Sequence, residues 1–221
     1  MRINKFVAAS TGMSRRAADD AISERRVTVN GKLPTTGYAV RTSDQVRLDG
    51  VLLTNLPVQT ILFHKPAAYI TSRDGQGSKT VYDLLPAELH HLKPVGRLDK
   101  YTSGLLLLSN DGGLTQQLTH PRHHKVKIYQ AYLDKDLAPL HRQMISDFGV
   151  QLEDGPSKLQ LERLKDGDDK GWQVIMYEGR NRQIRRTFQA LGYNVVKLHR
   201  TTFGTYTLPP DLAPGQYRTV P

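Results

Sequence analysis

The sequence predicts an α+β protein in which a small N-terminal domain precedes a larger domain with a mixed, mainly antiparallel sheet and flanking helices. Residues 1–56 show two short helical patterns followed by short strand patterns. From residue 61 to 221 apolar strand-like runs dominate, with only a few helical segments between them. Neither strict strand–helix alternation nor an internal repeat is present, which argues against a doubly wound or solenoid fold.

The N-terminal segment predicts two helices and a small sheet. Phe6, Val7 and Ala8 indicate a first helix that ends near Gly12, and Ser14 is a plausible N-cap for a second helix. Short strands follow at Val27–Val29, near Val40 and at Val46–Leu48. Asn30-Gly31 after the first strand is a hairpin signal. A unit of this size lies near the lower limit for independent folding.

Residues 57–60, which include Pro57, read as a linker, and the second domain then covers 61–221. Strands are expected at 68–72, 105–109, 128–133, 159–163, 172–176 and 195–199. Helices are expected at 111–119, 138–148 and 182–191.

Composition narrows the class of protein. The 221 residues are 38% hydrophobic, with no apolar run long enough to cross a membrane and no apolar signal region behind Met1-Arg2-Ile3. The absence of cysteine excludes disulfides and thiolate metal sites. We therefore expect a soluble, cytoplasmic protein that does not bind membranes and is a monomer.

The distribution of charge indicates a polyanionic partner. The formal net charge is +10, from 31 basic and 21 acidic residues. Residues 179–200 alone contain six lysines or arginines and no acidic residue. Positive charge gathered in one window favours nucleic acid, the commonest soluble polyanion.

The most informative segment is Gly96-Arg97-Leu98-Asp99, which continues through Thr102 and Gly104 into four consecutive leucines. The leucines predict a buried strand, so Asp99 is expected in a loop close to the interior, where an unpaired charge is costly. An aspartate in a glycine-containing loop is often just a turn or cap residue. A buried carboxylate paired with a cation is instead a candidate nucleophile.

Two further segments carry aromatic and basic residues. Tyr129, in Lys127-Ile128-Tyr129, is either an ordinary strand aromatic or a planar partner for a base drawn out of an RNA helix. Before it, three histidines lie among Arg122 and Lys125 without a nearby carboxylate, so we do not expect a metal site.

The basic segment Gly179–Arg186 leads into the helix expected at 182–191, whose buried face includes Ile184 and Phe188. Arg185 lies at the edge of that face, where it could point inward and pair with a carboxylate in bidentate geometry. Lys197-Leu198-His199-Arg200 predicts a strand whose apolar residue could form the floor of a pocket.

The N-terminal pattern resembles the S4 RNA-binding domain. The matching residues are Arg2, Lys5-Phe6-Val7, Ser14-Arg15-Arg16-Ala17 and Arg26-Val27-Thr28-Val29-Asn30-Gly31. Glu24-Arg25 departs from the pattern, since a glycine often precedes the final Arg-Val. The resemblance implies RNA contacts from these positions: Arg2, Lys5, Ser14, Arg15, Arg16, Arg25, Arg26 and Lys32.

The whole chain resembles the pseudouridine synthases that begin with an S4 domain and modify ribosomal RNA. The Asp99 segment is the most specific match. The other motifs follow in order and spacing: Arg122, Lys127-Ile128-Tyr129, Gly179-Arg180, Gln183-Ile184-Arg185 and Leu198-His199-Arg200. His64 and Ala68 depart from the pattern around Lys65-Pro66, without removing a reacting group.

The resemblance implies isomerisation of uridine to pseudouridine in ribosomal RNA or a ribosomal subunit precursor, without cofactor or metal. Asp99 would be the essential carboxylate, Tyr129 would stack on the flipped uracil, and Arg185 would keep Asp99 ionised and oriented. Substrate contacts would come from Arg97, Leu198, Arg122, Lys127, Arg180, Gln183 and Arg200. Whether Asp99 attacks the sugar or acts as a base, and which ribosomal RNA is the target, both stay open.

Two alternatives stand beside this interpretation. A non-catalytic RNA-binding factor in ribosome assembly could retain the fold, although it would have no need for Asp99, Tyr129 and Arg185 together. A hydrolase using Asp99 is disfavoured, because the sequence offers neither a Ser/His/Asp set nor paired carboxylates.

Overall fold

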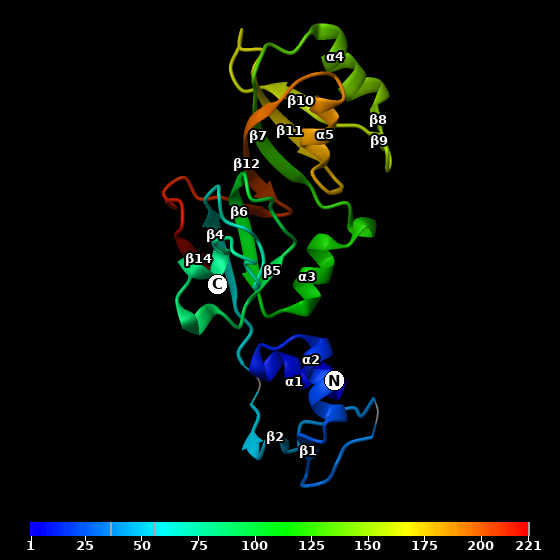
Figure 1. The fold of residues 1–221 in the computed structure, drawn as a ribbon, viewed down its shortest axis with the longest axis vertical. Helices are drawn as coiled ribbons and strands as arrows, with labels where there is room; N and C mark the ends of the chain where they lie inside the picture. The colour runs from blue at the N-terminus through cyan, green and yellow to red at the C-terminus, as the bar shows by residue number, and fades with distance from the viewer. Residues whose placement is uncertain (36, 55, 221) are drawn as a thin grey trace.

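The computed structural model describes residues 1–35, 37–54 and 56–220. Figure 1 shows the N-terminal unit at one end of an elongated molecule, with its helices α1 and α2 between its strands and the larger domain. The N-terminal unit contains α1 (Ile3–Thr11), α2 (Arg15–Ser23), β1 (Val27–Val29), β2 (Val46–Leu48) and β3 (Val51–Leu52). Its strands pair antiparallel in the order β1-β2-β3, and it has a hydrophobic core of its own.

The expected helix ends of this unit are confirmed. Gly12 ends α1 in a left-handed conformation with φ of 76°, which glycine adopts without steric cost. The Ser14 hydroxyl accepts a hydrogen bond from the Ala17 amide at 3.0 Å and so caps α2. Near Val40 the structure has only an isolated bridge between Arg2 and Ala39 rather than a strand.

The larger sheet runs in the order β10-β11-β7-β12-β6-β4-β14, with β5 paired to β6 and β13 paired to β12. All of its pairings are antiparallel except that between β12 and β6, which confirms the mixed, mainly antiparallel expectation. A separate hairpin is formed by β8 (Val150–Leu152) and β9 (Gly155–Ser157). The strands of the larger sheet are β4 (Thr60–Lys65), β5 (Lys93–Val95), β6 (Thr102–Ser109), β7 (Lys127–Leu133), β10 (Gln160–Arg163), β11 (Gly171–Met176), β12 (Val195–Phe203), β13 (Tyr206–Thr207) and β14 (Tyr217–Thr219).

Helices and short turns connect the strands. They are η1 (Val81–Leu84), η2 (Ala87–Leu89), α3 (Gly112–Thr119), η3 (Pro121–His123), α4 (Pro139–Gln143), η4 (Met144–Phe148) and α5 (Gln183–Gln189). The helix expected at 138–148 exists, but its second half, η4, is a π-helix. The strand expected at 68–72 is wrong. Ala68 has a positive φ of 72°, and Ile70 makes only an isolated bridge with Thr80.

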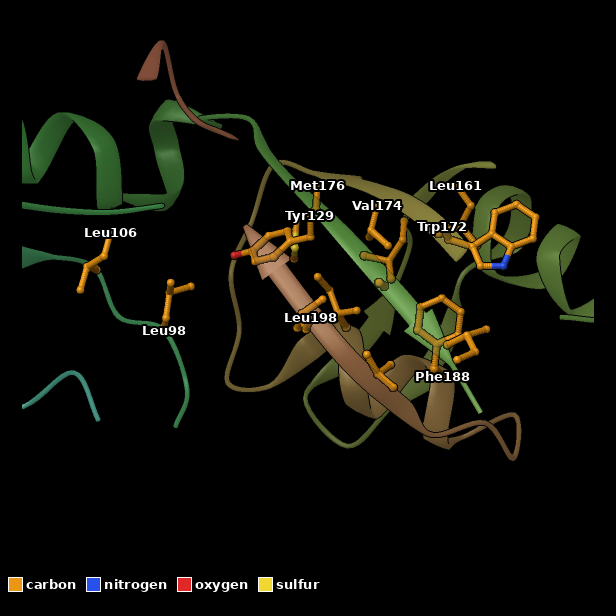
Figure 2. Close-up of a cluster of buried hydrophobic side chains, with 14 of the residues drawn as sticks. Leu98, Leu106, Tyr129, Leu161, Trp172, Val174, Met176, Phe188 and Leu198 are labelled. Carbon is orange, nitrogen blue, oxygen red and sulfur yellow. The ribbon is translucent and has the colours of Figure 1, made fainter. Parts of the chain in front are cut away.

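The leucine run is the centre of the core, as the sequence predicts. All four leucines of β6 are fully buried, and alternate ones pack into different clusters on the two faces of the sheet. The larger of these clusters continues from Leu98 through Leu198 to Trp172 and Phe188, as Figure 2 shows. β6 is therefore covered on both faces, which makes its N-terminal end a rigid support for the loop before it.

The N-terminal unit contacts the larger domain through the turn between α1 and α2. The Lys93 ammonium donates a hydrogen bond to the Met13 carbonyl at 2.8 Å. A Cβ at Gly12 would lie 3.1 Å from the His91 Cα, so the two backbones pack closely there. Among the helices that the structure describes, none has the length and apolar character needed to cross a bilayer.

Candidate active site

A cleft of about 450 Å³ opens beside the N-terminal end of β6 and is walled by β7, β11, β12 and the start of α5. It brings together residues that are far apart in the sequence. The cleft is lined by nearly all of the predicted catalytic and substrate-contacting residues: Asp99, Tyr129, Arg185, Arg97, Leu198, Lys127, Arg180, Gln183 and Arg200. Arg122 does not line it. That side chain lies on η3, just outside, with its Nε 3.2 Å from the His123 Nε2.

Asp99 lies in the loop between β5 and β6 and is half-buried. The loop turns at Gly96, whose φ of 72° favours glycine, and closes where the Thr102 amide donates to the Asp99 carbonyl at 3.1 Å. The Thr71 hydroxyl donates to the Leu98 carbonyl at 2.8 Å. These bonds fix the backbone on either side of the carboxylate, so Asp99 is held in place before any substrate arrives.

Lys65, which the sequence reasoning did not single out, is a fully buried cation beside this loop. Its ammonium donates hydrogen bonds to the carbonyls of Pro66, at 2.9 Å, and Thr102, at 2.8 Å. Burial lowers the pKa of Lys65 to about 8, and the negative charge of Asp99 opposes that lowering. A single lysine at the end of β4 was the available signal for this residue, and that signal does not by itself indicate burial.

Arg185 is not paired with Asp99 in the bidentate geometry that the sequence suggested. The ion pairs among the described residues do not include one between them. Instead, the guanidinium donates to the carbonyls of Val195, at 2.5 Å, and Tyr101, at 3.1 Å. Burial lowers the pKa of Arg185 and the charge of Asp99 opposes this, so the carboxylate acts on Arg185 through space.

Tyr129 and Leu198 form the apolar part of the cleft. Both are buried, on the neighbouring strands β7 and β12. In Figure 2 the Tyr129 hydroxyl points away from Trp172, toward the side of the cluster where Leu98 lies. Arg200 is directly opposite Tyr129 in the register, and Leu198 is opposite Thr102 on β6. An aromatic ring and an aliphatic side chain therefore stand next to the Asp99 loop.

Arg180 and Gln183 form hydrogen bonds with other groups of the protein. The Arg180 guanidinium donates to the carbonyls of Asp154, Gly155 and Pro156, and forms an ion pair of 2.9 Å with the Asp154 carboxylate. Gln183 is buried and hydrogen bonds to Ser157 and Glu178. Both residues line the cleft, yet their polar groups anchor the β8–β9 hairpin to the start of α5.

The residues of the N-terminal unit that are predicted to contact RNA are all exposed: Arg2, Lys5, Ser14, Arg15, Arg16, Arg25, Arg26 and Lys32. Arg26 differs from the rest because it forms ion pairs with Asp49, at 2.7 Å, and with Glu24, at 3.3 Å. Arg15 and Arg16 occupy the first turn of α2, as the sequence indicates. Within residues 1–35, 37–54 and 56–220, no three histidine or carboxylate side chains come together in a group that could hold a metal ion.

The protein therefore consists of a small basic helix-and-strand unit followed by a mixed-sheet domain, whose cleft combines charged and apolar side chains. Comparison with known protein families identifies both parts of the chain. Residues 1–46 match the S4 domain, and residues 59–190 match the RNA pseudouridylate synthase family. The chain belongs to the RNA pseudouridylate synthase family.

Individual relatives agree with this assignment. The chain is 37% identical to the ribosomal large subunit pseudouridine synthase B of Bacillus subtilis (strain 168), over 94% of this chain and 87% of that one. It is 35% identical to the ribosomal small subunit pseudouridine synthase A of Yersinia pestis, over 99% and 94%. A crystal structure of a pseudouridylate synthase superposes with a TM-score of 0.72 and 32% identity, covering 100% of this chain and 96% of that one. Some similar relatives are longer: the chain spans 49% of the pseudouridine synthase B of Xylella fastidiosa (strain 9a5c).

Proposed function

We propose that this enzyme isomerises a uridine of ribosomal RNA to pseudouridine, as a cytoplasmic monomer, with Asp99 as its essential carboxylate. The relatives from Bacillus subtilis and Yersinia pestis are named for the large and the small ribosomal subunit respectively, which supports ribosomal RNA as the substrate and leaves the subunit open. The observation that carries the proposal is the half-buried Asp99 in one cleft with Tyr129 and with the cations Arg185 and Lys65 nearby.

The chemistry exchanges one glycosidic bond for another. The bond between C1′ and N1 breaks, the uracil turns in the cleft, and a bond forms between C1′ and C5. The C5 proton leaves and N1 gains a proton, so no oxidant or reductant is consumed. A negative Asp99 can attack the sugar or remove a proton, and in either role it needs fixed cations rather than mobile water around it.

The surrounding residues fit a uridine turned out of its helix. Such a base loses its stacking neighbours, and the face of Tyr129 offers a replacement. Leu198 adds apolar contact, and Arg185 sets the position of the Tyr101 carbonyl two residues after Asp99. Exposed cations of the N-terminal unit, such as Arg15 and Lys32, would hold a neighbouring RNA helix through its phosphates, which position the RNA without reading its sequence.

The test is a tritium-release assay on ribosomal RNA labelled at uridine C5, since isomerisation frees that hydrogen to water. Asp99→Asn is expected to reduce release by about 10³-fold or more while RNA affinity stays within about threefold. Asp211→Asn, an exposed aspartate paired with Arg218 outside the cleft, serves as the matched control and should behave as wild type. Release by Asp99→Asn at the wild-type rate would contradict the proposed role of Asp99.

A second experiment addresses the alternative of a non-catalytic assembly factor and identifies the target. Pseudouridine is mapped in both ribosomal RNAs from cells lacking this protein and from complemented cells. We expect loss of one site or a few sites, restored by the wild-type chain but not by Asp99→Asn. An unchanged map in both RNAs, together with no tritium release by the wild-type protein, would favour the assembly factor.

A further inference from the structure

Arg200 is a buried cation that lines the cleft and has one unsatisfied donor. Only 2% of the residue is exposed, and it lines the cleft. Its Nε donates to the Leu105 carbonyl at 2.9 Å, but its buried Nη2 has no hydrogen-bond partner. A buried guanidinium nitrogen without an acceptor is costly, so this position favours a ligand that supplies one.

Lys127 adds a second cation at the same place. Its side chain passes close to Gly179, where a Cβ would lie 3.6 Å from the Lys127 Cε. The Lys127 ammonium and the Arg200 guanidinium lie near the same Phe203 ring, at 5.4 and 4.6 Å from its centroid. The ring thus holds the two cations on one wall of the cleft, partly removed from water.

The protein does not neutralise this pair. Among the described residues, neither Lys127 nor Arg200 takes part in an ion pair. Glu178 is the acidic residue that acts on Lys127 through space, but its carboxylate accepts hydrogen bonds from Arg180 and Gln183. Burial and the charge of Arg200 both lower the pKa of Lys127, as expected for a buried cation beside a like charge, and Glu178 only partly opposes this.

We infer that Lys127 and Arg200 form a binding pocket for one phosphodiester group of the RNA strand, next to the nucleotide that reacts. The inference rests on the proposed function for the identity of the anion. An arginine fork and a lysine ammonium are the usual partners of a phosphate, and the strand entering this cleft carries one at every nucleotide.

The position of the pocket supports a linkage adjoining the target uridine. Arg200 is opposite Tyr129 in the sheet register, so the two side chains lie next to each other on one face. Phe203 lies near Gly96, where a Cβ would be 4.0 Å from its ring, and Gly96 begins the turn that carries Asp99. A phosphate bound here would fix the sugar–phosphate backbone beside the sugar while the base turns.

Sulfate, a doubly charged stand-in for the phosphodiester, provides a test without RNA or catalysis. The pKa of Lys127 is measured by NMR on the full-length protein with the lysine side chains labelled, in sodium sulfate and in sodium chloride of equal ionic strength. We expect sulfate to raise the pKa of Lys127 by about one unit. In Arg200→Met the effect of sulfate should largely vanish, whereas Arg218→Gln, which alters an exposed arginine outside the cleft, should retain it. Equal pKa values of Lys127 in the two salts would overturn the inference.

RNA binding provides an independent readout. For the full-length protein on ribosomal RNA, Lys127→Gln should reduce the slope of log affinity against log salt concentration by about one unit, and Arg218→Gln should not change it. Lys127→Gln also leaves the buried Arg200 in place if Arg200→Met fails to fold. An unchanged slope for Lys127→Gln would contradict the pocket even if tritium release succeeds. Sulfate binding without tritium release by the wild type would contradict the proposed function and leave the pocket standing.

Discussion

Lys65 joins the two ends of the segment that carries the Asp99 loop. Its ammonium bonds the Pro66 carbonyl, where the chain leaves β4, and the Thr102 carbonyl, where it enters β6. A fully buried ammonium is costly unless hydrogen bonds and a nearby charge compensate it. Here the Pro66 and Thr102 carbonyl oxygens supply the hydrogen bonds and Asp99 supplies the nearby negative charge, so the buried cation is compensated and holds the loop in position.

This burial makes stability depend on pH in a specific window. Since the pKa of Lys65 falls from 10.5 to about 8 on folding, between these values the unfolded chain holds a proton that the folded chain has released. Raising the pH therefore stabilises the folded state, by about 2 kcal/mol between pH 8 and pH 10 from this residue alone. The measurement is urea unfolding at both pH values for wild type and Lys65→Met.

The comparison with Lys65→Met removes the contributions of other lysines and tyrosines, which titrate in both proteins. The expected result is a difference in free energy of unfolding, wild type minus variant, that increases from pH 8 to pH 10. A difference that stays constant, or decreases, would show that Lys65 keeps its proton in the folded protein.

At the scale of residues, the sequence predicted which side chains meet in the cleft but not which hydrogen bonds they make there. The Asp99, Tyr129 and Leu198 motifs could be predicted to meet because together they resemble those of the S4-domain pseudouridine synthases. The partners of Arg185 could not, because backbone carbonyls such as Val195 and Tyr101 carry no sequence signal. Lys65 is a single lysine in a strand, and only the tertiary structure shows that it points inward.

Among the elements, the parallel pairing of β6 with β12 depends on Gly104. Its φ is 108°, and a Cβ there would lie 2.2 Å from the Arg200 carbonyl oxygen. This contact brings together the strand that follows the Asp99 loop and the strand that carries Leu198 and Arg200. The glycine of the Asp99 motif is thus required by the close approach of two backbones rather than by chemistry.

Gly104→Ala is expected to lower the free energy of unfolding by about 3 kcal/mol or more, because the strained φ and the backbone clash add to each other. Thermal or urea unfolding measures the change. Gly112→Ala provides the matched control. Gly112 begins α3 in an ordinary conformation with no atom within 4 Å of the added Cβ, so its effect should stay within about 0.5 kcal/mol. Similar stabilities for the two variants would show that β6 and β12 can separate without cost.

Several elements were predicted correctly because their burial or their end residues leave a recognisable sequence pattern. Four consecutive leucines predict a strand that is buried on both faces. Ser14 marks a helix start because its side chain caps α2, and Gly12 marks a helix end because it takes a left-handed conformation. The strand expected at 68–72 failed because Ala68 takes a left-handed turn that its sequence does not reveal. The π-helical half of 138–148 also lacks a signal, since its side-chain pattern is compatible with an α-helix. The short strands β3, β5, β8, β9, β13 and β14 were missed because they have few residues, and the six-residue β4 was also not among the expected strands.

Over the whole molecule, positive charge lies at two separate places, one in each of two units that contact each other at the turn between α1 and α2. The cleft holds cations around Asp99, and the N-terminal unit exposes others along α2 and beyond β1. Lys93 bridges the two parts through the Met13 carbonyl, and the close packing of Gly12 against His91 supports that docking. RNA bound by both places would be held at a defined separation, which can select a structured target without base contacts at the N-terminal unit.

The exposed cations of the N-terminal unit should contribute unequally to that binding. Arg15→Gln and Lys32→Gln are each expected to reduce the slope of log affinity against log salt by about 0.7–0.9 units, as one phosphate contact is lost. Arg26→Gln provides the comparison, because Arg26 is already paired with Asp49 and Glu24 and should change the slope less. Filter binding of ribosomal RNA over a range of salt concentrations measures all three. If Arg15→Gln and Lys32→Gln leave the slope unchanged while tritium release remains normal, the N-terminal unit does not bind phosphate through these residues, and RNA affinity must arise at the cleft.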